Sequence, residues 1–381
     1  MLNLSQQSVG SPIRRLPIYR EPLIENGRAG QMPATGYLLD EKRASALAIR
    51  IRAGLNGQVE LWRGPARAVF FLTRHCNLGC TYCQSRGRDA VPFASPEVER
   101  LLDELSHDGT HHIHFTGGEP STYPSLVALT HQARLLEFGA SISTNAVAGS
   151  GFCIQLVQAG MQRFYISLDS FDSDAFDQVT NSRRQLPRVL DAIRGLVTAR
   201  DSGRDVHVTI NSVLGRSQVI RFLHDDARML RSMLRELIGL RPDDFKLLPD
   251  ATAARPLFED EAEKSRFVQL CKQWVPESFR MFHYRIDNLK RGGHGLSSEK
   301  PHFCYHTVDD RVFAADGVYP CIIQLREGGR RLYGHEDSPK EKESALQDFI
   351  CSDRRCDRIC LKHCFDVYRC LSTSVERNLR P

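Results

Sequence analysis

The chain has 381 residues, of which 41% are hydrophobic and 25% charged, and its formal net charge is +5. This composition is that of a globular protein, its length favours a main domain with a smaller appendage, and it lacks the Lys/Arg block of a nucleic-acid-binding tail. No apolar run approaches the ~20 residues that cross a bilayer, and the start MLNLSQQSVG does not resemble a signal peptide. We therefore predict a cytoplasmic protein that binds neither membranes nor nucleic acid.

Three cysteines follow the first strongly apolar stretch. Residues 1–62 read as an N-terminal extension with a helix from Lys42 to Leu55; the strand AVFFL then leads into FLTRHCNLGCTYC, which places Cys76, Cys80 and Cys83 in a CxxxCxxC loop. Three thiolates with no fourth cysteine nearby predict a 4Fe–4S cluster with one iron open to a ligand from outside the protein. A structural zinc ion is the alternative, but zinc prefers four ligands in paired CxxC arms.

A second motif lies in HHIHFTGGEP. A strand from His111 to Thr116 precedes a turn of small residues, where the backbone can approach a ligand closely; the turn comprises Gly117, Gly118, Glu119 and Pro120. Alternation along the strand puts His112 and His114 on one face and His111 on the other. One of these histidines could line the interior and act as an acid or base.

Residues 63–250 alternate between strand and helix patterns. Strands are expected at AVFFL, HIHFT, ASISTNA, RFYISLDS, DVHVTINSVL and DFKLLPD, and helices over 95–109, 126–138, 151–160, 186–203 and 219–240, the last as one or two helices. Such alternation predicts parallel strands with right-handed helical crossovers. Six units rather than eight predict an α/β fold: an open, partial (β/α)6 TIM-like barrel.

Polar residues end several of these strands. They are Ser143 and Asn145 on the third, Ser167 and Asp169 on the fourth, and Asn211 on the fifth. Because sites in such barrels lie at the carboxyl ends of the strands, we expect these residues to share one site with the cysteine loop and GGEP. Each could instead start a turn or cap the next helix.

The composition changes beyond Asp250. Residues 251–300 read as a linker with a helix, and residues 301–381 carry seven of the twelve cysteines: Cys304, Cys321, Cys351, Cys356, Cys360, Cys364 and Cys370. Clustered cysteines in a cytoplasmic chain favour metal or cluster ligation over disulfides. VFAA and VYPC predict a hairpin with Asp316-Gly317 as its turn. Cys153 and Cys271 lie in apolar helix patterns and are expected to be buried without ligand roles.

The motifs of the barrel resemble the signature of the radical S-adenosylmethionine (SAM) superfamily: CxxxCxxC with Tyr82 before its last cysteine, GGEP, and the runs STNA and SLDS. The resemblance implies that Cys76, Cys80 and Cys83 bind the catalytic cluster, whose open iron chelates SAM, and that one electron cleaves SAM to a 5'-deoxyadenosyl radical. It also implies cofactor-binding roles for Tyr82, Gly117, Gly118, Glu119, Ser143, Asn145, Ser167, Asp169 and Asn211. Ala146 stands where many relatives carry glycine.

The C-terminal cysteines resemble, more loosely, the auxiliary-cluster domain called SPASM or its shortened twitch form, with CSDRRC where a CxxC pair is usual. Seven thiolates imply one or two auxiliary iron–sulfur clusters, of which two are preferred. A zinc-stapled cap, joined by His306 or His363, is the alternative.

The sequence thus predicts a radical SAM enzyme, of the oxidoreductase or transferase type, that abstracts hydrogen from a small natural-product or nucleotide/sugar-like substrate. An auxiliary cluster would assist oxidation, substrate binding or sulfur transfer, and a low-potential donor such as flavodoxin or ferredoxin would supply the electron. Modification of a ribosomal peptide or protein is the alternative. A non-catalytic iron–sulfur sensor or electron carrier is a remote one.

Overall fold

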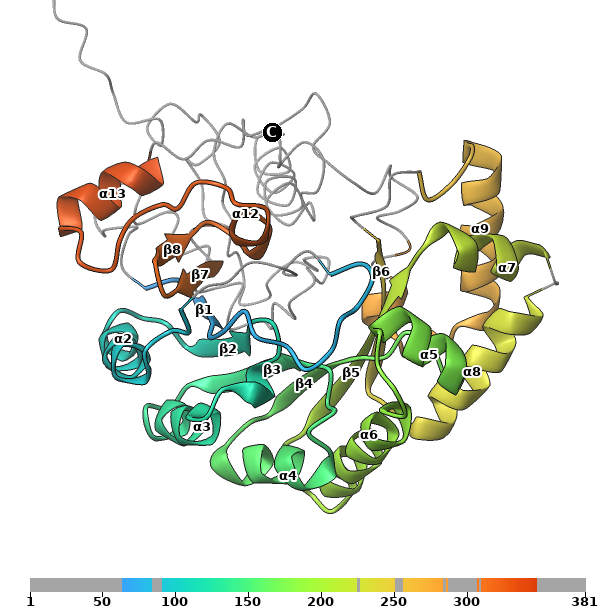
Figure 1. Ribbon diagram of the computed structural model, residues 1–381, viewed down its shortest axis with the longest axis horizontal. Coiled ribbons are helices and arrows are strands. Elements are labelled where there is room, and N and C mark those ends of the chain that lie inside the picture. The colour runs from blue at the N-terminus through green and yellow to red at the C-terminus, as the bar shows by residue number, and fades with distance from the viewer. Residues whose placement is uncertain are drawn as a thin grey trace, which may run out of the picture.

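The computed structural model of the protein describes residues 64–83, 91–224, 227–250, 256–283, 286, 307 and 310–347. Within them lies a curved sheet of eight strands in the order β6-β5-β4-β3-β2-β1-β7-β8 (Figure 1). Its strands are β1 (Arg67–Phe71), β2 (His112–Thr116), β3 (Gly139–Thr144), β4 (Arg163–Ser167), β5 (His207–Leu214), β6 (Asp244–Pro249), β7 (Asp310–Ala314) and β8 (Gly317–Tyr319). All neighbours pair in parallel except β7 and β8, and the sheet does not close. The predicted open barrel of six β/α units is confirmed.

Most helices follow the strands along the outer side of the sheet (Figure 1): α2 (Ser95–His107), α3 (Leu126–Leu135), α4 (Ser150–Ala159), α5 (Ser173–Thr180), α6 (Leu186–Asp201), α7 (Arg216–His224), α8 (Arg228–Leu240) and α9 (Glu261–Trp274). A short 3-10 turn, η3 (Pro120–Thr122), follows β2. Two further helices follow β8: α12 (Ile322–Arg326), whose Leu325 packs with Val69 and Val312 of β1 and β7, and α13 (Pro339–Gln347). The helical periodicity located α2, α3, α4 and α6 and the pair α7 and α8. The sequence analysis did not predict α5. No helix among the described residues is long and apolar enough to span a membrane.

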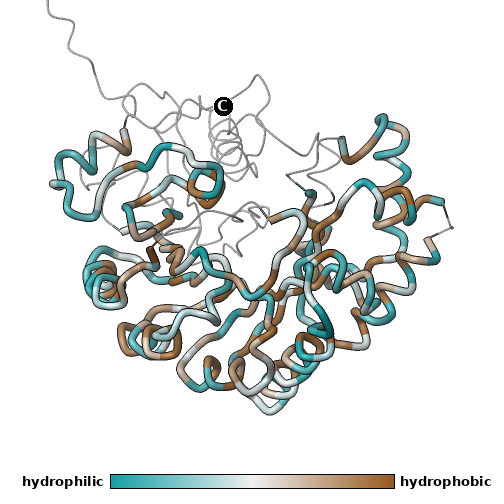
Figure 2. Tube along the Cα trace, viewed as in Figure 1, coloured by the Kyte–Doolittle hydropathy of each residue, from teal (hydrophilic) through white to brown (hydrophobic). Residues whose placement is uncertain are grey.

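The two faces of the sheet differ in polarity. Alternate residues such as Phe70, Phe115 and Phe164 are fully buried in the core beneath the helices, and apolar and polar stretches alternate along those helices (Figure 2). On the inner face, β1 and β7 carry a small apolar cluster that includes Val69 and Val312. Along β2 to β6 most inner-face positions are polar: His112, His114, Ser141, Ser143, Arg163, Tyr165, Ser167, His207, Thr209, Asn211, Asp244 and Lys246. The barrel interior therefore offers hydrogen-bonding groups and charge.

The predicted hairpin after residue 310 is present, and it extends the barrel sheet. β7 pairs in parallel with β1, and a buried ion pair joins these strands, with Arg67 Nη1 2.5 Å from Asp310 Oδ2. The turn lies one residue earlier than predicted, because Ala314 pairs with Gly317 and Ala315-Asp316 form the loop. Gly317 is needed for a close approach instead, since a Cβ there would lie 2.7 Å from the Tyr333 carbonyl oxygen. The division into an extension, a core, a linker and a C-terminal lobe stays a prediction.

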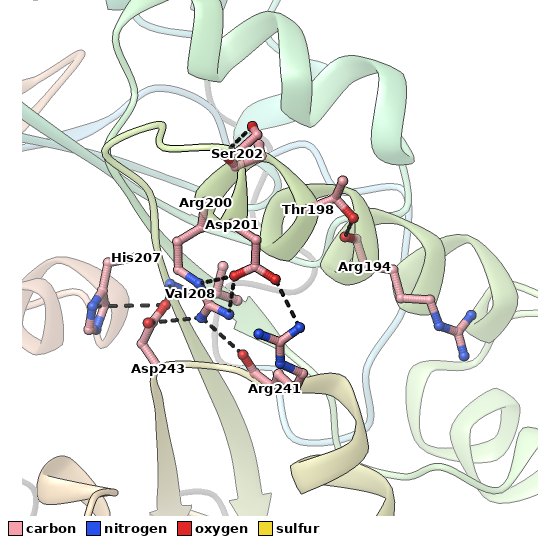
Figure 3. Close-up of polar contacts among 10 residues, drawn as sticks. Arg194, Thr198, Arg200, Asp201, Ser202, His207, Val208, Arg241 and Asp243 are labelled. Carbon is pink, nitrogen blue, oxygen red and sulfur yellow. Dashed lines mark hydrogen bonds and ion pairs between the residues drawn. The ribbon is translucent and has the colours of Figure 1, made fainter.

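A polar network closes the amino end of β5 and β6 (Figure 3). Asp243 accepts hydrogen bonds from Arg200 Nη1 at 2.9 Å and from the Val208 backbone N–H at 2.7 Å. Asp201 pairs with Arg241 at 2.9 Å. Because sites in parallel barrels lie at the opposite, carboxyl edge, this network joins α6 and α8 to the sheet rather than serving chemistry.

Candidate functional site

The cysteine loop leaves β1 at the carboxyl edge of the sheet and is fastened to the end of α5. The backbone N–H groups of Gly79 and Thr81 donate to the carbonyls of Thr180 and Val179, both at 2.9 Å. The last carbonyls of a helix have no partner within the helix, so α5 offers acceptors at its C-terminus. Cys76, Cys80 and Cys83, all half-buried, are thereby held over the strand ends.

The glycine pair after β2 forms the seat of this loop. Gly118 donates to the Thr73 carbonyl at 2.6 Å, and Glu119 donates to the His75 carbonyl at 2.8 Å. A Cβ on Gly117 would lie 2.4 Å from Thr73 O, and one on Gly118 would lie 2.3 Å from His75 O. Any side chain at either position would push the loop away from the sheet. The two motifs predicted from the sequence are thus in direct backbone contact.

The Glu119 carboxylate is buried beneath the glycine pair, with 1% of the residue exposed. Its Oε1 accepts from the Ser121 backbone N–H at 2.9 Å and from Thr144 Oγ1 at 2.7 Å, and its Oε2 accepts from the Asn145 N–H at 2.7 Å. Burial raises the pKa of this carboxyl, and the hydrogen bonds oppose that shift. Glu119 therefore ties the end of β2 to the end of β3.

Asn145 links the end of β3 to the cysteine loop. Its Nδ2 donates to Asn77 Oδ1 at 2.7 Å and lies 3.9 Å from Cys76 Sγ, which also accepts from the Leu78 N–H at 3.4 Å. The next residue, Ala146, has φ +56°, in the left-handed region that glycine favours. The turn therefore keeps a glycine-like conformation without glycine.

Tyr82 and Asp169 join the other side of the loop to β4 and β5. The Tyr82 hydroxyl donates to Asp169 Oδ2 at 2.5 Å, and the Val213 N–H donates to Asp169 Oδ1 at 2.7 Å. Burial, and then the negative charge of Asp169, raise the pKa of Tyr82. The phenol is therefore a hydrogen-bond donor at neutral pH.

The remaining predicted residues at the strand ends face the barrel interior. Ser143 Oγ lies 3.0 Å from His114 Nε2, and Ser167 is exposed at the end of β4. Asn211 pairs in register with Ser167, and its Oδ1 is buried with no hydrogen-bond partner among the described residues. A buried acceptor of this kind is costly unless a ligand or water donates to it.

The cysteine thiols suit an iron–sulfur cluster. Burial, then Asp169 and neighbouring thiols, raise the pKa of Cys80 to about 12, and burial also raises the pKa of Cys76. Bound iron would offset this cost, because its positive charge stabilises thiolates. In the described part of the chain, no three His, Cys, Asp or Glu side chains are grouped to hold a single metal ion. A 4Fe–4S cube makes a different demand, one thiolate for each of three irons.

Of the other cysteines discussed in the sequence analysis, three lie among the described residues and six lie outside them. Cys153 and Cys271 are buried, as expected for small apolar side chains. Cys321 is half-buried at the N-terminus of α12. The remaining predicted auxiliary ligands lie outside the described residues: Cys304, Cys351, Cys356, Cys360, Cys364 and Cys370.

Some residues that build the site were not singled out from the sequence. Thr73 and Thr144 take part through a backbone carbonyl and a hydroxyl, and Asn77 receives the Asn145 amide. The C-terminal turn of α5, whose Val179 and Thr180 carbonyls hold the loop, was not predicted either. The available signal was Asp172, whose side chain accepts from the Ala175 N–H at 2.9 Å and caps α5.

The residues of this site lie within a segment that matches a known protein family. Residues 70–230 match the model of the Radical SAM superfamily. The chain is 35% identical to the GTP 3',8-cyclase of Streptomyces coelicolor over 151 residues, which are 38% of this chain and 43% of that protein. It is 28% identical to a probable GTP 3',8-cyclase of Methanopyrus kandleri over 57% of this chain and 68% of the relative. Several curated relatives are thus matched over about half their length or less.

Solved structures share the fold. The crystal structure of SuiB from Streptococcus suis aligns with a TM-score of 0.55 over 83% of this chain and 72% of that one, at 16% identity. The structure of native anSMEcpe with bound AdoMet and Cp18Cys peptide aligns with a TM-score of 0.56 over 82% of this chain and 97% of that one, at 13% identity. The family's cofactors are a 4Fe–4S cluster and SAM, as predicted from the motifs. Residues 70–230 of the chain therefore carry a domain of the Radical SAM superfamily.

Proposed function

We propose that the protein is a radical SAM enzyme that abstracts hydrogen from a small nucleotide-like or sugar-like metabolite. When bound, the cluster and SAM supply a 5'-deoxyadenosyl radical after one-electron reduction. The observation that carries the proposal is the backbone contact between the cysteine loop and the glycine pair, because it brings the thiols of Cys76, Cys80 and Cys83 to the same edge as the polar strand ends.

The chain's own groups have distinct roles in this proposal. Gly117, Gly118 and Glu119 fix the loop and present backbone to the cofactor, and Tyr82 with Asp169 fixes its other side. Asn145, Ser167 and Asn211 offer polar groups to the ribose and carboxylate of SAM. The orphan acceptor of Asn211 supports this assignment, since a donor from a ligand would satisfy it.

The polarity of the interior favours an anionic or polyhydroxylated substrate over an apolar one. Lys246 is 5% exposed, and its Nζ lies 4.2 Å from the centre of the Tyr165 ring. Arg163 adds a second cation on the same face. The relatives named GTP 3',8-cyclase support a nucleotide as the class to test first. We keep peptide or protein modification as the competing substrate class.

The C-terminal cysteines belong to the same proposal. One or two auxiliary iron–sulfur clusters, preferably two, would accept the electron of a substrate radical, bind the substrate or donate sulfur. A flavodoxin or ferredoxin of low potential would reduce the catalytic cluster. Iron, sulfide and zinc content per chain separates this arrangement from a zinc-stapled cap.

Anaerobic reconstitution with iron, sulfide, dithionite and SAM tests the proposal. We expect release of 5'-deoxyadenosine, and its loss when Cys76, Cys80 and Cys83 are replaced by alanine. The Cys153→Ala variant is the control, because that thiol is buried in α4, and it should keep the activity. Deuterium transfer from labelled nucleotides or peptides into 5'-deoxyadenosine identifies the substrate class. A reconstituted protein that binds a cluster but never cleaves SAM would be a sensor or electron carrier.

A further inference from the structure

Two histidines and two serines form a continuous line of hydrogen bonds on the inner face of β2 and β3. Ser141 Oγ lies 2.8 Å from both His112 Nε2 and His114 Nδ1, and His114 Nε2 lies 3.0 Å from Ser143 Oγ. Ser141 makes one further, longer contact of 3.4 Å to the Ile113 carbonyl. The pairing of β2 with β3 in register places the four side chains in this order.

The line connects the two ends of the barrel. Its middle members, Ser141 and His114, are buried, with 0% and 6% exposed. Its end members are half-buried: His112 begins β2 at the amino end, and Ser143 lies near the carboxyl end of β3, two residues before Asn145. A proton entering at one end could therefore reach the other without crossing open solvent.

We propose that Ser143, His114, Ser141 and His112 form a proton relay between a substrate in the barrel and the amino end of the sheet. The inference rests on the proposed function only for the substrate at Ser143. The hydrogen-bonded line itself does not depend on it. This assigns Ser143 to the substrate rather than to SAM, and it assigns two of the three sequence histidines to proton transfer.

The relay moves one proton from the substrate to His112, and His114 stays neutral. A substrate X–H gives its proton to Ser143 Oγ while the Ser143 hydroxyl proton passes to His114 Nε2. The proton on His114 Nδ1 passes to Ser141 Oγ, and the Ser141 hydroxyl proton passes to His112 Nε2. The substrate is left as its conjugate base, His112 becomes imidazolium, and His114 remains neutral with its other nitrogen protonated.

The surroundings of His114 suit this role better than that of a terminal base. Burial, and then the positive charge of Arg67 on β1, hold its pKa well below the ordinary value; His112, Lys246 on β6 and Arg326 on α12 act in the same direction. The Tyr165 ring of β4 lies edge-on against it, with ring centres 5.7 Å apart. An imidazolium here is therefore disfavoured, whereas a change of tautomer carries no charge.

The geometry at Ser141 makes the relay testable, because a hydroxyl donates one hydrogen bond at a time. When His112 is neutral with its proton on Nδ1, Ser141 donates to His112 Nε2 and accepts from His114 Nδ1–H. When His112 is protonated, it donates to Ser141, which then donates to His114 Nδ1 and leaves the proton on His114 Nε2. The protonation of His112 should thus switch the tautomer of His114.

Ring 15N NMR on histidine-labelled, anaerobically reconstituted enzyme with its cluster oxidised tests this coupling. His112→Gln and His114→Gln assign the two rings. We expect His114 to change from the Nδ1–H to the Nε2–H tautomer as His112 gains its proton between about pH 8 and 5. In Ser141→Ala the change should disappear. The matched control is Ser212→Ala, another buried serine in a strand, which should retain it.

The relay is overturned if His114 keeps one tautomer while His112 titrates, if His112 takes up no proton in this range, or if the switch persists in Ser141→Ala. Each of these results would leave the four side chains as structural polar packing. Failure of the proposed function shows separately, as a wild-type enzyme that releases no 5'-deoxyadenosine.

Discussion

The absence of a Cβ at Gly118 allows the cysteine loop to lie close against the turn after β2. We predict that Gly118→Ala destabilises the fold by about 1–3 kcal/mol through overpacking and sharply lowers iron incorporation, because the new Cβ would lie 2.3 Å from His75 O and 2.5 Å from Arg74 O. Both obstacles are backbone atoms that no rotamer change removes. Urea unfolding and iron analysis after reconstitution measure the two effects.

The control for this substitution is Gly239→Ala in α8. Nothing lies within 4 Å of a Cβ at this position, so alanine should stabilise the helix by about 0.5–1 kcal/mol and leave the iron content unchanged. If both variants incorporate iron as the wild type does, the close approach of Gly118 does not position the loop.

His114 makes a separate prediction about pH. Burial lowers its folded-state pKa below the ordinary 6.5, so below that pH the unfolded chain binds a proton that the folded chain does not. The free energy of unfolding therefore does not depend on this group above about pH 6.5. Below that pH it falls by up to about 1.4 kcal/mol per pH unit. His207, whose pKa burial also lowers, adds to the slope.

Urea unfolding at several pH values from about 7 to 5 measures this dependence. His114→Gln should show a shallower slope than the wild type, and His114→Asn serves if the glutamine variant does not fold. Equal slopes in the wild type and both variants would mean that His114 takes up its proton in the folded state.

Candidate site residues could be predicted where they lie in short motifs with a characteristic spacing. The cysteine loop, GGEP and the polar strand ends were recognised this way, and the structure brings Tyr82 to Asp169 and Asn145 to Cys76. The hydrogen bond from Thr144 to Glu119 could not be predicted, because the two residues are far apart in sequence. The same holds for the line from His112 to Ser143, which depends on the register of two strands.

At the scale of elements, α5 links helix stability to the cysteine loop. Asp172 caps this eight-residue helix, and the carbonyls at its other end hold Gly79 and Thr81. We predict that Asp172→Ala, which removes a cap contributing about 1 kcal/mol, frays α5 and lowers iron incorporation. Iron and sulfide analysis, with the cluster's absorbance, measures the loss.

A matched control exists in α9. Asp260 caps that helix through a 2.7 Å hydrogen bond from the Glu263 N–H, and among the described residues no hydrogen bond or ion pair joins α9 to the loop. Asp260→Ala should lose a similar amount of stability and keep its iron. Equal iron content in the two variants would show that α5 does not support the loop.

Element prediction succeeded where periodicity was long and failed where it was short or non-local. The core helices and β1 to β6 follow from repeated apolar positions in 63–250. α5 has only two buried residues, Phe176 and Thr180, so its pattern is too short to stand out. β7 was expected in a hairpin, but its parallel pairing with β1 was not predicted. That pairing joins distant segments of the chain, since Arg67 and Asp310 are 243 residues apart.

At the scale of the whole molecule, the eight-stranded sheet is one structure built from two distant segments. Packing on both faces of β1 and β7 supports the joint, with Phe70 stacked on Phe313 at 5.4 Å and Val69 in one cluster with Val312. The buried pair of Arg67 and Asp310, each 2% exposed at its side chain, lies at the start of these strands. β7 and β8 are therefore an integral part of the barrel sheet.

This arrangement predicts a large energetic asymmetry between two ion pairs. Asp310→Asn leaves the Arg67 charge buried and should cost about 3–5 kcal/mol, whereas Asp243→Asn, at the partly exposed pair with Arg200, should cost about 1 kcal/mol through the lost charge. The double variant Arg67→Met with Asp310→Leu should recover much of the loss, because apolar groups can replace a buried pair. Urea unfolding of the variants measures all three. If Asp310→Asn costs no more than Asp243→Asn, the joint between β1 and β7 depends on packing alone, and the segment from residue 310 should unfold separately from the barrel.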